Sequence, residues 1–480
     1  MAPWKLRVRS RGAAHAVSTS AARARLAAVT EPGDAVQPRA RRAPPALAAA
    51  LAGGAFPLVV LANDIVYGYE PGPDAIAYLT RARQFARLDL LDPRTNVMLA
   101  PGYSAFLAAV GWIAGFAPLL LVASQALLYL GAVELFVRTL AAQRILRPGR
   151  EPLLARALLL GNPNLWFLAG TIGAELLVAV LLLAITALLL RWREEVGMRS
   201  GWLASAACGL LAVTRFEWSL LPLLAPVLVR GGRGRARRTA VLLLGPILAL
   251  SANAWRNHEM FGRPWPFSFG AGTVTYGGNN PNLDGSWHDA ATTPGYVLPR
   301  HRQALAELAA LERRDLRAWA PRQDRFWRGL AAEAWRERPL AQLAVVPLKL
   351  GKLWAMPLHF DLYTSDRGFR RSLLLGELFR RDRWPWYAPW KHGLYLVLHW
   401  LLLGAVAIGA REVWRRRAVV PAAGHLVAWA LAITAGVSLL YALPWYGLPR
   451  FHGPLMPLLS VFAAAALAQL PRRGAASTAS

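Results

Sequence analysis

Long apolar runs, several of them close to 20 residues, dominate this sequence. A helix of ~20 residues crosses the ~30 Å hydrocarbon core of a bilayer, so each such run is a candidate membrane span. Hydrophobic residues make up 55% of the chain and charged residues only 17%. The sequence therefore predicts an all-α polytopic membrane protein.

The charge balance is strongly basic, because 55 Lys and Arg face 27 Asp and Glu and leave a net charge of +28. In a soluble chain this excess would indicate nucleic-acid binding. Here most arginines fall in short turns between apolar runs, where they set topology and meet anionic lipid. We therefore expect membrane lipid, and not nucleic acid, as a partner.

Cysteine and histidine usage predicts no metal site. The single cysteine, Cys208, lies in an apolar run and excludes both an intrachain disulfide and a thiolate zinc site. The nine histidines show no metal-ligand spacing. No cofactor is required by these patterns, and a divalent cation is compatible with them but not indicated.

Arginine-rich turns fix the predicted topology. Residues 1–45 are predicted to form a disordered, basic cytoplasmic tail. The positive-inside rule assigns three further arginine-rich turns to the cytoplasm, around 138–150, 191–199 and 230–238. Because the turns on both sides of 201–229 are then cytoplasmic, this segment must cross twice as a hairpin, with Arg215 and Glu217 at its outer tip. About ten crossings follow from this rule; they are 46–66, 118–137, 152–169, 171–190, 201–214, 216–229, 239–256, 393–410, 419–442 and 452–470.

The spans divide the chain into modules. Residues 46–256 form a predicted N-terminal catalytic module with an outer loop at 67–117, in which 75–88 reads as an amphipathic helix and 101–117 as an interfacial or re-entrant one. The 75–88 pattern sets Ile76, Leu79, Ala82 and Phe85 against Arg81, Arg83 and Arg87. An outer region with interfacial helices follows at 257–391 and includes a charged helical stretch near 300–338. We predict C-terminal spans at 392–470 and a cytoplasmic tail at 471–480.

Two carboxylates stand out at the outer ends of helices. Asp74 follows the first span, and a charged group at a bilayer boundary is a functional candidate by default. It can act as the base for an acceptor hydroxyl, or it can simply cap the helix that follows. Glu175 begins a later span and is either a second catalytic carboxylate or a charge that complements the helix dipole.

A lipid phosphate needs fixed cations, and arginine offers bidentate donors for phosphate oxygens. Arg450 is the leading candidate, with Arg256, Lys349 and Lys352 behind it; the alternative is that these side chains snorkel to the headgroups. The turn-rich segment with Asn279, Asn280 and Trp287 reads first as tight turns and alternatively as a sugar contact.

Short motifs in a consistent order resemble the GT-C membrane glycosyltransferases, particularly bacterial relatives of the protein O-mannosyltransferases and the lipid A aminoarabinose transferase. They are Pro73-Asp74 with Tyr78, Ala100-Pro101-Gly102-Tyr103, Asn162-Pro163, Ala174-Glu175, Gly209-Leu210 with Thr214 and Arg215, Trp255-Arg256-Asn257, Gly277-Gly278-Asn279-Asn280-Pro281, and Arg450-Phe451-His452 with Pro454 and Pro457.

The resemblance implies a GT-C bundle in which Asp74 is catalytic and Tyr78 contacts sugar or acceptor. It implies a polyprenyl-phosphate sugar as donor, inversion at the anomeric carbon, and Arg450, His452 and Arg215 near the lipid phosphate. The chain departs from the family at Ala75, where many members have a second acidic residue, and at His452, which replaces an arginine.

Together these patterns predict a glycosyltransferase of the bacterial inner membrane that serves the cell envelope, with its active site facing outward. The acceptor is a glycan, lipid or protein. Two alternatives remain at this stage: a lipid-linked sugar transporter or flippase, which would need broken helices at the midplane, and an O-antigen ligase or polymerase.

Overall fold

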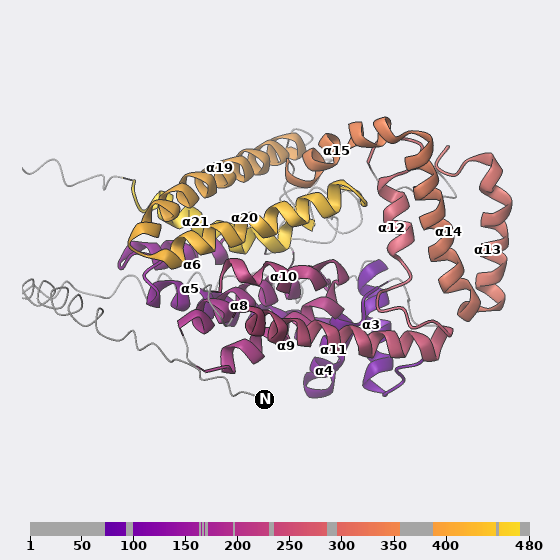
Figure 1. Ribbon diagram of the computed structural model, residues 1–480, viewed down its shortest axis with the longest axis horizontal. Helices are drawn as coiled ribbons and strands as arrows, with labels where there is room; N and C mark the ends of the chain where they lie inside the picture. The colour runs from indigo at the N-terminus through magenta and orange to yellow at the C-terminus, as the bar shows by residue number, and fades with distance from the viewer. Residues whose placement is uncertain are drawn as a thin grey trace, which may run out of the picture. The chain divides into compact units, whose positions relative to one another are not determined.

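A computed structural model describes residues 73–92, 99–162, 165, 168, 171–194, 197–229, 235–285, 295–355, 387–447 and 451–470. The predicted first span (46–66), both tails, Trp287 and Arg450 lie outside these residues. The described residues form helices joined by turns, without a strand among them (Figure 1). The helices of the N-terminal part are α3 (Pro73–Ala86), α4 (Pro101–Ala114), α5 (Pro118–Ala142), α6 (Arg150–Leu160), α8 (Ala174–Glu194), α9 (Arg199–Thr214), α10 (Leu221–Leu224) and α11 (Arg235–Phe261).

The later part of the chain supplies two further groups of helices. One group, at the right of Figure 1, consists of α12 (Ala271–Gly278), α13 (Arg302–Arg314), α14 (Leu316–Glu337) and α15 (Pro339–Trp354). The other consists of α19 (Tyr387–Arg415), α20 (Pro421–Ala442) and α21 (Met456–Leu467), which lie beside α6 and α8. Proline begins α4, α5, α15 and α20, because its fixed φ suits the first helical position and its missing N–H is not needed there.

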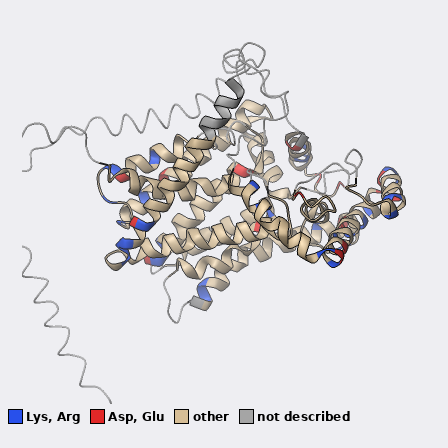
Figure 2. Cartoon of the chain, turned by 90° about the horizontal axis from the view of Figure 1, so that it is seen from above, with Lys and Arg blue, Asp and Glu red and all other residues tan. Residues whose placement is uncertain are grey.

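Five helices in the described part are long and apolar enough to cross a membrane: α5, α8, α20, the stretch 236–261 of α11 and the stretch 396–418 that includes most of α19. These helices indicate a membrane protein, as the apolar runs predict. Figure 2 shows that the positions of Lys, Arg, Asp and Glu gather near helix ends and on the α13 and α14 side, while most of the bundle consists of other residues. The total of about ten crossings, which the positive-inside rule gives, stays a prediction.

The segment after Arg215 is broken as its prolines predict. The chain runs through a short 3₁₀ turn (Phe216–Leu220), the four-residue α10 and a second 3₁₀ turn (Ala225–Val227). Pro222 and Pro226 lack backbone N–H donors, so this arm cannot form one continuous helix. The predicted break at the hairpin tip, between 214 and 216, is confirmed.

Small residues let α9 and α11 approach closely. A Cβ on Gly245 would collide with the Ser205 backbone oxygen, and one on Gly209 would lie 2.7 Å from the Gly245 oxygen. Ser205 Oγ donates to the Val241 oxygen (2.6 Å) and accepts from the Gly245 N–H (2.9 Å). Small interfacial residues and hydroxyl hydrogen bonds are the usual means of helix association in lipid.

The charged stretch predicted near 300–338 forms α13 and α14. Asp315 separates them and caps α14, because its carboxylate accepts hydrogen bonds from the N–H groups of Arg317 and Ala318 (3.0 and 3.1 Å). Tyr276 of α12 packs against Trp327 of α14, so this group of helices has its own small core.

The polar face of α3 differs from the prediction. Leu79, Ala82 and Phe85 are buried as expected, but Ile76 is 54% exposed and Arg81 is only 2% exposed. Arg81 is buried because Leu99, just before α4, accepts a hydrogen bond from its Nη1 (2.6 Å). Burial, and then the nearby Arg256, lower the pKa of Arg81 to about 9. The backbone at Leu99 therefore lies against a face of α3 that the periodicity assigns to water.

Candidate functional site

An ion-paired cluster forms where α8 begins and α9 ends. Arg215, directly after α9, donates through Nη2 to Glu175 in the first turn of α8, and its Nη1 lies 3.1 Å from Glu217 Oε1. All three side chains are less than one-fifth exposed. Burial acts to lower the pKa of Arg215, but the charges of Glu175 and Glu217 outweigh it and raise the pKa well above its usual value. Arg215 is therefore a permanent cation between two carboxylates.

Two aromatic residues from the C-terminal helices close this cluster. The Tyr441 hydroxyl, near the end of α20, donates to Glu217 Oε1 at 2.6 Å. The Phe451 ring stacks on Tyr441 with centroids 4.2 Å apart and lies 5.6 Å from the Arg215 guanidinium carbon. The cluster thus joins the N-terminal and C-terminal parts of the bundle.

Helix α3 brings Tyr78 near this cluster. Tyr78 is buried, and its charge interaction with Arg215 helps raise the pKa of that guanidinium. Asp74 lies one turn before Tyr78 and therefore on the same face of α3, but its side chain is exposed. The predicted role of Asp74 as the catalytic carboxylate stays a prediction.

Helix α4 fixes the position of Tyr78. The Tyr103 ring meets Tyr78 edge to face at 4.8 Å, and its hydroxyl donates to Gln125 Oε1 at 2.9 Å. Ser104 Oγ donates to the Tyr78 backbone oxygen at 3.2 Å. A Cβ on Gly102 would lie 2.7 Å from backbone atoms of residues 213 and 214, so α4 touches the end of α9 just before Arg215. These contacts connect the predicted outer loop to the ion-paired cluster.

Lys349 and Asn279 lie inside the protein and hold the chain between α20 and Phe451. Both are 0% exposed, and Lys349 Nζ donates to Asn279 Oδ1 at 3.0 Å. Asn279 Nδ2 in turn donates to the backbone oxygen of Pro444 at 2.6 Å. Burial lowers the pKa of Lys349 to about 8. The predicted roles of Lys349 in donor binding and of Asn279 in sugar contact stay predictions.

Other predicted site residues also have protein partners. Asn280 is buried and its amide donates to the Gly277 oxygen (2.8 Å), while Lys352 donates to the Asp284 oxygen (2.7 Å). Arg256 of α11 donates to the Leu90 oxygen at 2.8 Å and lies over Phe85. Arg256 thus lies against the end of α3 and the loop that follows it.

His452 is buried beside α15. Its Nδ1 lies 2.5 Å from the Leu353 oxygen, and its ring stacks on Trp354 with centroids 5.2 Å apart. The His399 ring also lies close, with its centroid 5.4 Å from that of His452. The predicted role of His452 near the lipid phosphate stays a prediction.

Sequence reasoning missed part of the cluster. It placed Glu217 at the hairpin tip without a site role, and it gave no role to Tyr441. Glu217 is detectable in principle, because it follows Arg215 by two residues at a predicted outer turn. Tyr441 has no sequence signal, since it meets Glu217 across 224 positions of chain.

A close approach between α12 and the chain after α20 yields a stability prediction. A Cβ on Gly278 would collide with the Trp445 backbone oxygen. We expect Gly278→Ala to destabilise the protein by about 1–3 kcal/mol, since overpacking forces the backbone to shift. The thermal midpoint in detergent measures this loss. Gly436→Ala in α20, where a Cβ meets open space, is the matched control and is expected to leave the midpoint equal or higher; equal midpoints for both variants would contradict the packing argument.

In the described part of the chain, no group of three or more His, Cys, Asp and Glu residues could hold a metal ion. No protein-family model matches the sequence. No curated protein matches it either.

Among solved structures, the chain is similar to a crystal structure of the oligosaccharyltransferase of Archaeoglobus fulgidus in complex with Zn and sulfate. The identity is 13%, the TM-score is 0.44, and the match covers 88% of this chain and 48% of that one. This chain thus spans about half the length of that protein.

Proposed function

We propose that this protein is an integral membrane glycosyltransferase that moves a sugar from a polyprenyl-phosphate donor to an acceptor on the non-cytoplasmic face. One observation carries the proposal: buried Tyr78, one helical turn after the exposed Asp74 on α3, interacts with Arg215 of the Glu175–Arg215–Glu217 cluster. The sequence resemblance to the GT-C enzymes supports the same reading, because most of its motifs meet at this place.

In the proposed reaction, an acceptor hydroxyl attacks the anomeric carbon of the donor sugar. The new glycosidic bond forms as the bond to the lipid phosphate breaks, and polyprenyl phosphate leaves with the bonding electron pair. Asp74 takes the proton of the attacking hydroxyl, and attack from the opposite face inverts the anomeric centre. Arg450 stabilises the charge that develops on the departing phosphate.

The Glu175–Arg215–Glu217 cluster has a positioning role in this proposal. Glu175 is engaged by Arg215, and we assign the role of base to Asp74. Arg215 is in turn held by Glu217 and covered by Phe451, the residue that follows Arg450. In this proposal the cluster holds Tyr78 on α3 and Phe451 in fixed positions.

Product analysis tests the function directly. Purified protein in proteoliposomes is supplied with a panel of radiolabelled polyprenyl-phosphate sugars and with membrane glycolipid and protein fractions as acceptors. We expect labelled glycosyl product together with released polyprenyl phosphate. Transbilayer movement of the intact donor without any product would instead establish a flippase and overturn the proposal.

Replacing Arg450 tests the phosphate contact. We expect Arg450→Ala to lower kcat/KM for the donor by about 10–100-fold, since charge-assisted hydrogen bonds to a phosphate contribute about 1.5–3 kcal/mol. Arg450→Lys keeps the charge but not the bidentate geometry and should lie between the two. Unchanged donor kinetics in Arg450→Ala would remove this residue from the phosphate site.

A further inference from the structure

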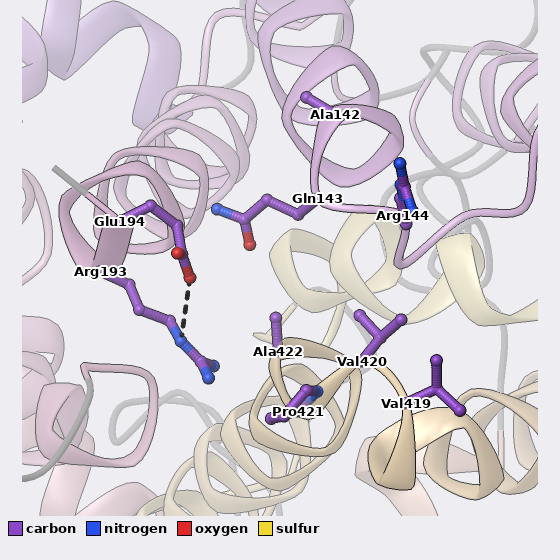
Figure 3. A pocket seen from close by; sticks show the side chains of 9 residues that line it. All are labelled: Ala142, Gln143, Arg144, Arg193, Glu194, Val419, Val420, Pro421 and Ala422. Atoms are coloured by element: carbon purple, nitrogen blue, oxygen red, sulfur yellow. Dashed lines mark ion pairs between the residues drawn. The ribbon is translucent and has the colours of Figure 1, made fainter. Parts of the chain in front are cut away.

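A second polar pocket lies at the opposite ends of the same helices. It is bounded by the end of α5 with the turn that follows, the end of α8, and residues 419–422 at the start of α20, and its volume is about 380 Å³ (Figure 3). Glu175, in the first turn of α8, belongs to the candidate active site, whereas Arg193 and Glu194 in the last turn of α8 line this pocket. The two sites are therefore separated by the length of a candidate membrane span.

The position of the pocket suits a lipid headgroup. Three candidate spans, α5, α8 and α20, reach it with their ends. The end of a span is where hydrocarbon gives way to the polar headgroup layer. Exposed Val419 and half-buried Val420 border the pocket on the α20 side and offer apolar surface for the start of an acyl chain.

Both signs of charge line the pocket. The Arg193 side chain is only 3% exposed; its Nη1 lies 2.5 Å from His425 Nδ1 and its Nε lies 3.4 Å from Glu194 Oε1. Arg144, in the turn after α5, is exposed and adds a second guanidinium. Two cations and one carboxylate would suit a ligand that itself combines a phosphate with a positive group.

Gln143 supplies an acceptor that needs a donor. Its Nε2 donates to the Leu190 oxygen at 2.5 Å, which fixes the amide. Its Oε1 is buried, and no donor from the described residues bonds to it. Buried acceptors in proteins are nearly always satisfied. In Figure 3 this amide lies between Glu194 and Ala422, within the pocket.

We propose that this pocket binds the headgroup of an ethanolamine phospholipid. Arg144, the exposed guanidinium, takes the phosphate, and the ammonium N–H groups donate to Gln143 Oε1 and Glu194. A choline headgroup carries the same charges but has no N–H to donate. A headgroup with phosphate alone leaves Glu194 facing a negative charge. The lining therefore favours an ethanolamine headgroup over a choline headgroup and over one that carries only phosphate.

Native mass spectrometry of the full-length protein tests this selectivity. The protein is exchanged into mixed micelles with phosphatidylethanolamine, phosphatidylcholine and phosphatidylglycerol of identical acyl chains. We expect phosphatidylethanolamine to be retained over phosphatidylcholine by about tenfold, the effect of one satisfied charge-assisted hydrogen bond. Equal retention of the two lipids, or preference for phosphatidylglycerol, would overturn the proposal.

Matched variants locate the site and guard against a folding artefact. Gln143→Leu removes one of the two acceptors and should reduce the preference for ethanolamine, whereas Gln143→Glu keeps an acceptor and should retain it. Arg144→Gln should weaken retention of all phospholipids alike. Arg411→Gln, an exposed arginine on α19 outside the pocket, is the control and should bind as the unaltered protein does. An undiminished ethanolamine preference in Gln143→Leu would exclude this pocket as the site.

Soluble phosphoethanolamine separates a lipid site from a site for a free metabolite. Because the pocket lies at the ends of candidate spans, we expect the lipid to be retained in the presence of a thousandfold excess of the soluble headgroup. Complete displacement of the lipid by phosphoethanolamine would show a water-facing metabolite site and contradict the lipid assignment.

Discussion

Replacing Asp74 with asparagine is expected to reduce sugar transfer by at least about 100-fold, because a positioned general base contributes about 10²–10⁴ to rate. Asparagine has nearly the shape of aspartate but cannot take the proton of the acceptor hydroxyl. Asp74 is exposed in the first turn of α3, so the substitution leaves the core intact. Initial rates in proteoliposomes at fixed donor and acceptor measure the loss.

Two variants separate chemistry from helix capping. An acidic residue in the first turn of a helix stabilises it by only about 0.3–1 kcal/mol, so a purely capping Asp74 predicts normal rates in Asp74→Asn. Asp89→Asn, an exposed carboxylate in the loop after α3, is the matched control and should retain full activity. Full activity of Asp74→Asn itself would remove the proposed base.

Replacing Arg215 with methionine is expected to destabilise the protein by about 3–5 kcal/mol, the typical cost of breaking a buried ion pair from one side. The change leaves Glu175 and Glu217, whose side chains are 14% and 8% exposed, without their shared cation. Thermal unfolding in lipid nanodiscs, followed by tryptophan fluorescence, measures the loss.

A triple variant that neutralises the whole cluster shows whether the uncompensated charges cause the loss of stability. Arg215→Met combined with Glu175→Gln and Glu217→Gln removes the uncompensated charges and should recover most of the stability. Arg138→Met is the surface control, because Arg138 pairs with Glu134 at 72% side-chain exposure and such pairs contribute at most about 1 kcal/mol. If the thermal midpoint of Arg215→Met is no lower than that of Arg138→Met, this result would contradict a structural role for the cluster.

Much of the helical framework is predictable because it follows from one-dimensional patterns. Apolar runs long enough for a bilayer predict α5, α8, α11, α19 and α20, and a charged helical stretch predicts α13 and α14. Prolines at 222 and 226 predict the broken arm after the hairpin tip. Each of these features is set by neighbours in the sequence.

The candidate site is only partly predictable, because its contacts join distant segments. Charge parity places Glu175 and Arg215 at outer helix ends, and the structure pairs them across 40 positions. The bonds from Tyr441 to Glu217 and from Lys349 to Asn279 span 224 and 70 positions and leave no periodic trace. The burial of Arg81 is equally hard to predict from the sequence, since the backbone oxygen that its side chain bonds belongs to Leu99, 18 residues further along the chain.

In the proposed enzyme, Asp74 and Arg450 open to one aqueous side, away from the arginine-rich turns. Labelling of single cysteines with a membrane-impermeant maleimide tests it, after Cys208→Ala removes the one native cysteine. We predict that Asp74→Cys and Arg450→Cys react in intact spheroplasts, whereas Arg144→Cys reacts only after the membrane is opened. Reaction of positions 74 and 450 from opposite sides would contradict the account.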